Sequence, residues 1–118
     1  MPDRPVPGPG PGPVPDPDRS LTLCVLLWAR PGAEDALTDY EDRVLALLPG
    51  HGGRVLQRAR RAADAEADAP LEVQVLEFAS RDGLSSYMTD DRRLALATDR
   101  DRAVARTQVI EVALLPPG

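Results

Sequence analysis

Hydrophobic positions along the chain gather into four strand-like runs. Residues 21–29 are apolar at almost every position, which is typical of a strand with both faces covered. Residues 71–79 predict a second strong strand, and residues 106–115 predict a last one that two prolines stop. Residues 54–61 predict a more exposed strand, in which one face carries Val55, Gln57 and Ala59 and the other Leu56, Arg58 and Arg60.

Two helical stretches separate these strands. The acidic residues 34–35 suit the first turn of a helix, because the helix macrodipole favours negative charge there. Apolar side chains then recur at three- and four-residue intervals, and this stripe consists of Leu37, Tyr40, Val44, Leu47 and Leu48. The Pro- and Gly-rich residues 49–53 end this helix. Ser80 offers an N-cap for the second helix, and Asp90 or Asp91 can restart it.

The order strand–helix–strand–strand–helix–strand predicts an α+β fold, a ferredoxin-like βαββαβ sandwich. We expect this domain to span residues 21–118. Residues 1–20 alternate Pro with Gly, Val and Asp, and this composition predicts a disordered tail. A proline-rich ligand for an SH3-like groove is the alternative, but the interrupting glycines weaken a polyproline helix.

Such a fold places both helices on one face of the sheet. The other face would then expose apolar side chains in a monomer, and a patch of that size normally marks an interface. We therefore expect a homodimer through the sheet face, forming a dimeric α/β barrel. We place Val75 and Ile110 on opposite faces of the sheet. Substitution by aspartate should break the dimer at whichever of the two residues lies on the face that the subunits share.

Composition and charge exclude several kinds of chemistry. All 14 basic residues are arginine, as a GC-rich genome favours, so no lysine is present for a Schiff base or a Walker A motif. The net charge of −5 disfavours nucleic acid. The single cysteine, Cys24, excludes an intrachain disulfide. No apolar run has the length of a membrane span and no signal peptide begins the chain, so we expect no membrane partner and a cytoplasmic location.

Two sequence features resemble the DUF1330 family of the dimeric α/β-barrel superfamily, which includes the antibiotic-biosynthesis monooxygenase-like proteins. They are the His-Gly-Gly-Arg turn at 51–54 and the strand end Leu-Glu-Phe-Ala-Ser at 76–80. Tyr40 and Tyr87 also fall where such proteins carry aromatic residues. The similarity covers about residues 21–115. It implies a homodimer with a cleft between sheet and helices in each subunit, where superfamily members perform oxygenation without cofactor, cyclisation, isomerisation or haem breakdown.

His51 and Glu77 are the candidate catalytic residues. His51 is the only side chain whose ordinary pKa lies near neutrality, and a carboxylate such as Glu77 could orient it as a general acid or base. Alternatively, His51 only terminates the first helix. Glu77 lies in a strand predicted to be buried, so it is either a proton-transfer group or the partner of Arg54, Arg58 or Arg106 in a salt bridge.

Four further residues are candidates for substrate binding. Tyr40 and Tyr87 could direct hydroxyl groups into the cleft, but both lie on an apolar stripe, which favours core packing with a hydroxyl group that reaches solvent. Trp28, at the end of the first strand, could stack on a flat ligand, and Arg58 could contact a polar group of the substrate. A lone histidine makes a metal site improbable, so we expect neither metal nor cofactor.

These observations support two hypotheses. The first is an enzyme without cofactor, such as a cyclase, isomerase or oxygenase of secondary metabolism, acting on a hydrophobic, polyketide-like or aromatic small molecule. The second is a non-catalytic dimeric module for ligand binding or assembly. Fold-level similarity alone does not decide between them.

Overall fold

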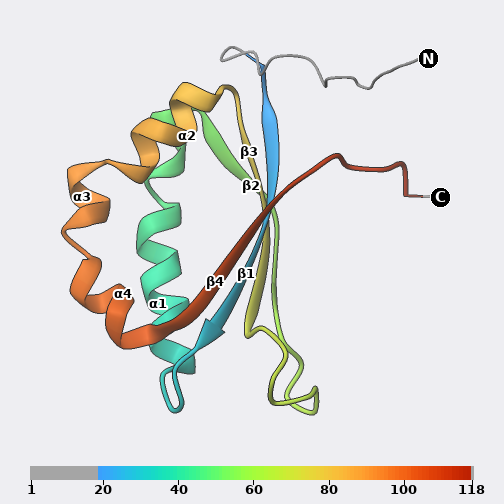
Figure 1. The fold of residues 1–118 in the computed structure, drawn as a ribbon, viewed down its shortest axis with the longest axis vertical. Coiled ribbons are helices and arrows are strands. Elements are labelled where there is room, and N and C mark those ends of the chain that lie inside the picture. Colours follow the sequence, from blue (N-terminus) through green and yellow to red (C-terminus); the bar gives the residue numbers. More distant parts are fainter. Residues whose placement is uncertain (1–18, 118) are drawn as a thin grey trace, which may run out of the picture.

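A computed structural model describes residues 19–117 as one sheet with all helices on one side (Figure 1). The predicted tail falls mostly on residues 1–18, which lie outside the described residues. In chain order the elements are β1 (Leu21–Ala29), α1 (Glu34–Leu45), the 3₁₀ turn η1 (Leu48–His51), β2 (Gly53–Arg60), β3 (Glu72–Phe78), α2 (Arg81–Met88), α3 (Asp91–Leu94), α4 (Ala97–Ala103) and β4 (Val104–Val112).

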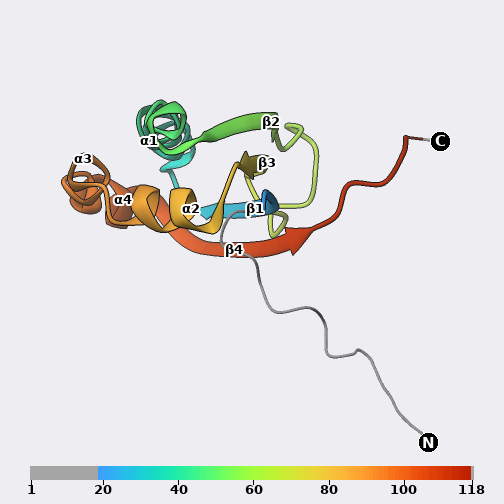
Figure 2. The same cartoon turned by 90° about the horizontal axis from the view of Figure 1, so that it is seen from above.

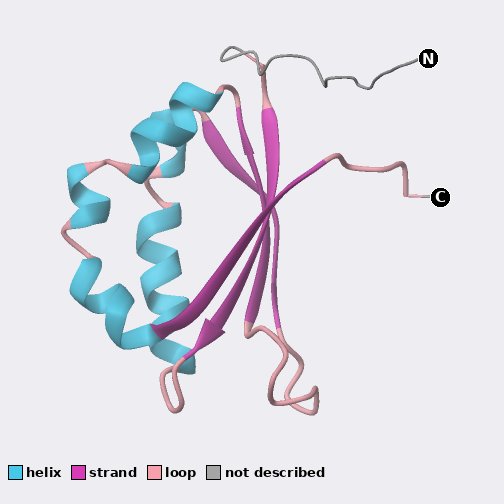
Figure 3. Cartoon of the chain, viewed as in Figure 1, coloured by secondary structure: helices cyan, strands magenta, loops and turns pink. Residues whose placement is uncertain are grey.

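The strands form an antiparallel sheet in the order β2-β3-β1-β4. This order, with the helices confined to one face (Figures 2 and 3), confirms the predicted ferredoxin-like α+β fold. The two most apolar runs of the sequence, β1 and β3, occupy the centre of the sheet. They are therefore the strands that need apolar side chains on both faces.

The hydrophobic core lies between the sheet and α1. Alternate residues of β1 point into it, and these are Leu21, Leu23, Val25 and Leu27. Leu37 and Val44 of α1 and Phe78 of β3 belong to this core, and all three are almost completely buried. Full burial of each such side chain contributes roughly 1.5–3 kcal/mol to stability. The stripe predicted on the first helix is thus the face that packs on the sheet.

The register of the strands settles which residues share the outer face, opposite the helices. Cys24 of β1 is paired with Val75 on one side and Ile110 on the other. Residues paired across antiparallel strands point to the same face. Val75 and Ile110 therefore lie together on the outer face, and our expectation that they lie on opposite sides was wrong.

A β-bulge in β2 breaks the predicted alternation of residues 54–61. Val55 is paired with Leu76 on the inner face, whereas Gln57 is paired with Val75 on the outer face. The irregularity lies at Leu56, where β2 has one residue more than β3. Val55 therefore lies on the opposite face from Gln57, and the bulge turns Arg58 toward the helices.

Capping side chains start the helices that were predicted after β3. Ser80 accepts a hydrogen bond from the backbone N–H of Gly83 at 3.0 Å and so caps α2. Asp90 accepts one from the N–H of Arg92 at 2.8 Å and restarts the chain as α3. Both predicted caps are confirmed. In the part of the chain that the structure describes, no helix is long and apolar enough to cross a membrane.

Candidate functional site

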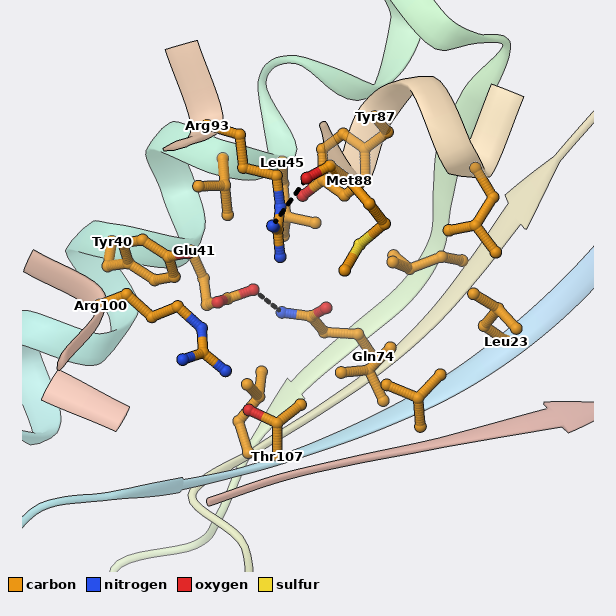
Figure 4. A pocket seen from close by; sticks show the side chains of 16 residues that line it. Leu23, Tyr40, Glu41, Leu45, Gln74, Tyr87, Met88, Arg93, Arg100 and Thr107 are labelled. Carbon is orange, nitrogen blue, oxygen red and sulfur yellow. Dashed lines mark hydrogen bonds between the residues drawn. The ribbon is translucent and has the colours of Figure 1, made fainter. Parts of the chain in front are cut away.

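A cavity of about 470 Å³ lies between the inner face of the sheet and the helices (Figure 4). Nine of its sixteen lining residues are Leu, Val or Met, so most of its wall is apolar. Val109 of the edge strand β4 also lines the cavity and is 56 % exposed, which places an opening on that side. The cavity has the size and the apolar lining of a small-molecule site.

A buried carboxylate and a buried amide form the polar centre of this cavity. Glu41 lies on the apolar stripe of α1 and therefore points toward the sheet, and it is only 6 % exposed. Gln74 projects from the inner face of β3 and is 1 % exposed. The side-chain amide of Gln74 donates a hydrogen bond of 2.7 Å to Glu41 Oε1, drawn as a dashed line in Figure 4.

Further polar groups hold Gln74 in position behind the cavity. Its Nε2 also donates to Glu72 Oε2 at 2.7 Å, so both amide protons are engaged. Arg58 in turn binds Glu72 at 2.6 Å and Asp42 of α1 at 2.6 Å. The chain of contacts therefore runs from the surface at Asp42 to Glu41, and it fixes the orientation of the amide that Glu41 meets.

Burial raises the pKa of Glu41 above its ordinary value. The nearby carboxylate of Glu72 acts in the same direction, while the hydrogen bond from Gln74 and the charges of Arg58 and Arg93 oppose the shift. A carboxyl group in this position can hold or release a proton closer to neutral pH than an exposed glutamate. This property suits a general acid or base.

Tyr40 and Tyr87, which the sequence left open as cleft or core residues, both line this cavity and are buried. Burial raises the pKa of both phenols, so both hydroxyl groups stay protonated at neutral pH. The guanidinium carbon of Arg93 lies 5.1 Å from the centre of the Tyr87 ring. Arg93, Arg100 and Thr107 complete the polar part of the lining.

His51 lies outside the cavity lining, at the contact between η1 and the helices α2 and α3. Its Nε2 is 2.7 Å from Asp90 Oδ2, and its Nδ1 is 2.6 Å from Ser86 Oγ. Asp90, and not Glu77, is thus the carboxylate that orients the ring. Hydrogen bonds from Arg92 and His51 lower the pKa of Asp90, which keeps this carboxyl group ionised.

The grouping of Ser86, His51 and Asp90 resembles a catalytic triad in composition, but its bonding differs. Because Asp90 accepts from Nε2–H, the neutral ring can accept a proton from Ser86 only at Nδ1. The Ser86 hydroxyl is also 3.0 Å from the carbonyl oxygen of Gly83, one turn earlier in α2. The His51 ring packs edge-on against Tyr87 at 6.0 Å. These contacts make His51 a support for the cavity wall.

Glu77 and Trp28 lie on the outer face of the sheet, away from the cavity. Glu77 accepts a hydrogen bond from Arg54 Nε at 2.8 Å, which is one of the salt bridges considered from the sequence. Trp28 packs under the guanidinium of Arg106 at 4.3 Å and donates from its indole N–H to the carbonyl oxygen of Asp68. Neither residue meets His51.

Sequence reasoning missed the cavity residues Glu41, Gln74, Arg93 and Arg100. A signal existed for Glu41, which lies four residues after Leu37 and three before Val44 and so interrupts an apolar stripe with a charge. The partner Gln74 is 33 residues away, and only the folded sheet shows that the two meet.

These features define an α+β sandwich with a ligand-sized cavity beneath its helices, and the sequence of the chain identifies its family. Residues 29–113 match the family model described as "Domain of unknown function (DUF1330)", so the chain belongs to the DUF1330 family. No curated protein is similar enough to the sequence to count as a match.

Solved structures of the same fold come from several bacteria. A protein of unknown function from Rhodopseudomonas palustris is 18 % identical, with a TM-score of 0.67 and coverage of 85 % of each chain. SnoaB, a cofactor-independent oxygenase from Streptomyces nogalater, is 14 % identical, with a TM-score of 0.62 and coverage of 85 % of this chain and 99 % of its own. A dimeric ferredoxin-like protein of unknown function from Thermobifida fusca is 15 % identical, with a TM-score of 0.59 and coverage of 80 % and 91 %. At these identities the likeness shows the fold alone.

Proposed function

We propose that this protein is a homodimeric enzyme that needs no cofactor and transfers protons on a hydrophobic small molecule held in the cavity. The observation that carries the proposal is a buried carboxyl group, Glu41, whose hydrogen-bonded amide partner holds it in an apolar cavity of about 470 Å³. Such a site can exclude water around an aromatic or polyketide-like substrate and offer one oriented base to it. Cyclisation, isomerisation and oxygenation of such substrates can each begin with proton removal from carbon or oxygen.

The proposed chemistry assigns separate roles to the cavity residues. Glu41 accepts a proton from the substrate, and Gln74 keeps the carboxylate in one orientation. The protonated hydroxyl groups of Tyr40 and Tyr87 can donate hydrogen bonds to an oxygen on which negative charge develops. His51, one of the two candidates from the sequence, acts in this scheme by supporting Tyr87.

The dimer is part of the same proposal. The outer face carries a group of apolar or weakly polar residues with no helix over it: Cys24, Leu26, Val73, Val75 and Ile110. The solved ferredoxin-like proteins from Thermobifida fusca and Bacteroides fragilis are described as dimeric. A second copy of the chain placed on this face would cover it and complete an α/β barrel.

A generic carbon acid tests the proposed base without knowledge of the natural substrate. The probe is 5-nitrobenzisoxazole: a base removes its ring C–H proton, the N–O bond breaks, and a coloured cyanophenolate is released. We expect the protein to accelerate this reaction with a rate that rises as Glu41 loses its proton. Glu41→Gln should reduce the accelerated rate by at least about 100-fold.

Three further variants sharpen this test. Asp39→Asn removes a charge from the exposed side of the same helix and should leave the rate unchanged. His51→Gln and Glu77→Gln examine the two candidates from the sequence in the same assay. Full activity of the Glu41→Gln variant would contradict the proposal. If Glu77→Gln lost activity instead, the base would be Glu77, on the outer face of the sheet.

One observation favours the alternative of a non-catalytic binding module. Gln74, Glu72, Arg58 and Asp42 all have hydrogen-bonded partners in one continuous chain, as a purely structural network would. In that case the same probe would bind in the cavity without reacting. Calorimetric binding with no release of the cyanophenolate would support this alternative.

A further inference from the structure

Two arginines of the cavity lack the ion pairs that other arginines of the chain make. Arg54, Arg58, Arg81 and Arg92 each reach a carboxylate oxygen at 2.6–2.8 Å. Within residues 19–117, by contrast, no carboxylate lies within 4.0 Å of the Arg93 guanidinium.

Arg100 is also poorly paired. Its single carboxylate contact among the described residues is with the next residue, Asp101, at 3.9 Å. Both Arg93 and Arg100 line the cavity, and Figure 4 shows their guanidinium groups turned toward the region of Glu41 and Gln74. The pair thus brings two positive charges to the cavity, where the charge of Arg93 also acts on Glu41.

The Arg93 side chain has hydrogen-bonding capacity that the protein does not use. Its Nε is buried and has no hydrogen-bond partner among the described residues. Its Nη1 makes one long contact, 3.5 Å, with the carbonyl oxygen of Met88, and the side chain also hydrogen-bonds the Tyr87 hydroxyl group. A buried donor without a partner is costly. Because Nε has almost no accessible surface, a ligand in the cavity would contact the terminal nitrogens of the Arg93 guanidinium group.

The chemistry of the lining selects the kind of acceptor. A planar guanidinium group matches the two oxygens of a carboxylate, and two such groups on one side of a cavity favour a single small anion. Most of the remaining wall is apolar and includes Leu23 and Val25 of β1 and Val109 of β4. A ligand that satisfies both parts is therefore an apolar molecule with one anionic end.

We propose that the cavity takes a hydrophobic carboxylic acid, with its carboxylate between Arg93 and Arg100 and its apolar body against β1 and β4. This inference rests on the proposed function, which places the substrate in this cavity. It adds the class of substrate: an aromatic or conjugated acid whose reacting carbon would face Glu41.

Two probes of equal size test this inference, 2-naphthoate and its uncharged amide, 2-naphthamide. Isothermal titration calorimetry at pH 7 should show that the wild-type protein binds the acid at least about tenfold more tightly than the amide. Arg93→Gln and Arg100→Gln should each reduce this preference strongly and leave the affinity for the amide nearly unchanged. Arg102→Gln removes the same charge from an exposed position of α4 and should keep the preference.

The outcomes separate this inference from the proposed function. Equal affinity for acid and amide in the wild-type protein would overturn the carboxylate inference and leave the cavity as a ligand site. Binding of neither probe would overturn both. Val109→Trp, at the open side of the cavity, should weaken the binding of both probes. If it changes the affinity of neither, the probes bind elsewhere and the inference fails.

Discussion

Glu41 owes its properties to its place on α1. The same stripe that buries Leu37 and Val44 carries Glu41 toward the sheet. Among residues 19–117, Gln74 alone meets it there with a hydrogen bond. A carboxyl group so placed loses hydration when it ionises, which is why burial raises its pKa. The general base that we propose at Glu41 would thus be placed by helical periodicity and would need no special loop.

This raised pKa predicts how stability depends on pH. The folded state holds the Glu41 proton more tightly than the unfolded chain does. Below the ordinary pKa of glutamate, this group therefore does not lower the free energy of unfolding. As the pH rises from that value through the raised pKa of the folded state, ionisation of Glu41 destabilises the protein increasingly. Glu41→Gln removes the group and keeps an oxygen that can accept from Gln74. The melting temperature of this variant relative to wild type should therefore increase between pH 4 and pH 8.

Calorimetric unfolding of both proteins at several pH values measures this difference. The variant has to be compared with the wild type because other carboxyl groups also titrate as the pH changes. The groups around position 41, Glu72, Arg58 and Arg93, are the same in both proteins, so their contributions cancel to a first approximation. Asp39→Asn is the matched control, and its difference from wild type should not change with pH in the same direction. A difference for Glu41→Gln that falls with rising pH would contradict the assignment.

Single-residue predictions from the sequence succeeded where the signal was local. Tyr40 and Tyr87 were placed on apolar stripes, and both are buried in the wall of the cavity. Arg58 was a substrate candidate, whereas the structure places it behind Gln74 as the partner of Glu72. That contact depends on the bulge at Leu56 and on the pairing of β2 with β3, which no local pattern encodes.

Among the elements, η1 and α2 depend on a close backbone contact. A Cβ atom at Gly83 would overlap the carbonyl oxygen of His51, so α2 can dock on η1 only with glycine at this position. The contact is reinforced by the bonds from His51 to Ser86 and Asp90. Since Tyr87 lies one turn further along α2, the same contact positions one wall of the cavity.

Gly83→Ala should accordingly destabilise the protein, although alanine is the better helix former. We expect a loss of about 1–3 kcal/mol in the free energy of unfolding, as for other overpacked sites. Gly50→Ala is the control, because a Cβ atom there would meet nothing within 4 Å. Urea unfolding followed by circular dichroism measures both variants. Equal stability of Gly83→Ala and wild type would show that α2 can move away without cost.

The order and type of the elements were predictable, but some boundaries and faces were not. Ser80 and Asp90 mark helix starts by a local chemistry that can be read directly. The first helix ends at Leu45, before residues 49–53, which were predicted to end it. Leu48–His51 form a separate 3₁₀ turn that was not predicted. Which side of β1 faces the helices depends on packing between distant segments, since both sides are apolar.

The molecule as a whole has two faces with different tasks. The helical side encloses the cavity, whereas the outer face of the sheet has no helix over it (Figure 2). Its central positions are Cys24, Val75 and Ile110, which the register brings side by side. Ile110 is 42 % exposed. An uncovered apolar face at the centre of a sheet is the expected location of a subunit interface.

We therefore expect wild-type protein to sediment as a dimer at micromolar concentration. Because they share one face, Val75→Asp and Ile110→Asp should each yield folded monomers, since a charge buried at a symmetric interface would face its own copy. Leu94→Asp is the control, as this residue is 53 % exposed on α3, on the helical side. A wild-type protein that sediments as a monomer would contradict the proposed dimer.

The position of Trp28 has a practical consequence for such work. The sole tryptophan of the chain lies on the outer sheet surface, stacked with Arg106 and tethered to the loop at Asp68. Its emission therefore reports on the environment of that surface and is remote from the cavity. Intrinsic fluorescence can follow self-association during dilution without a label, while occupancy of the interior has to be followed by calorimetry or by the optical signal of the ligand itself.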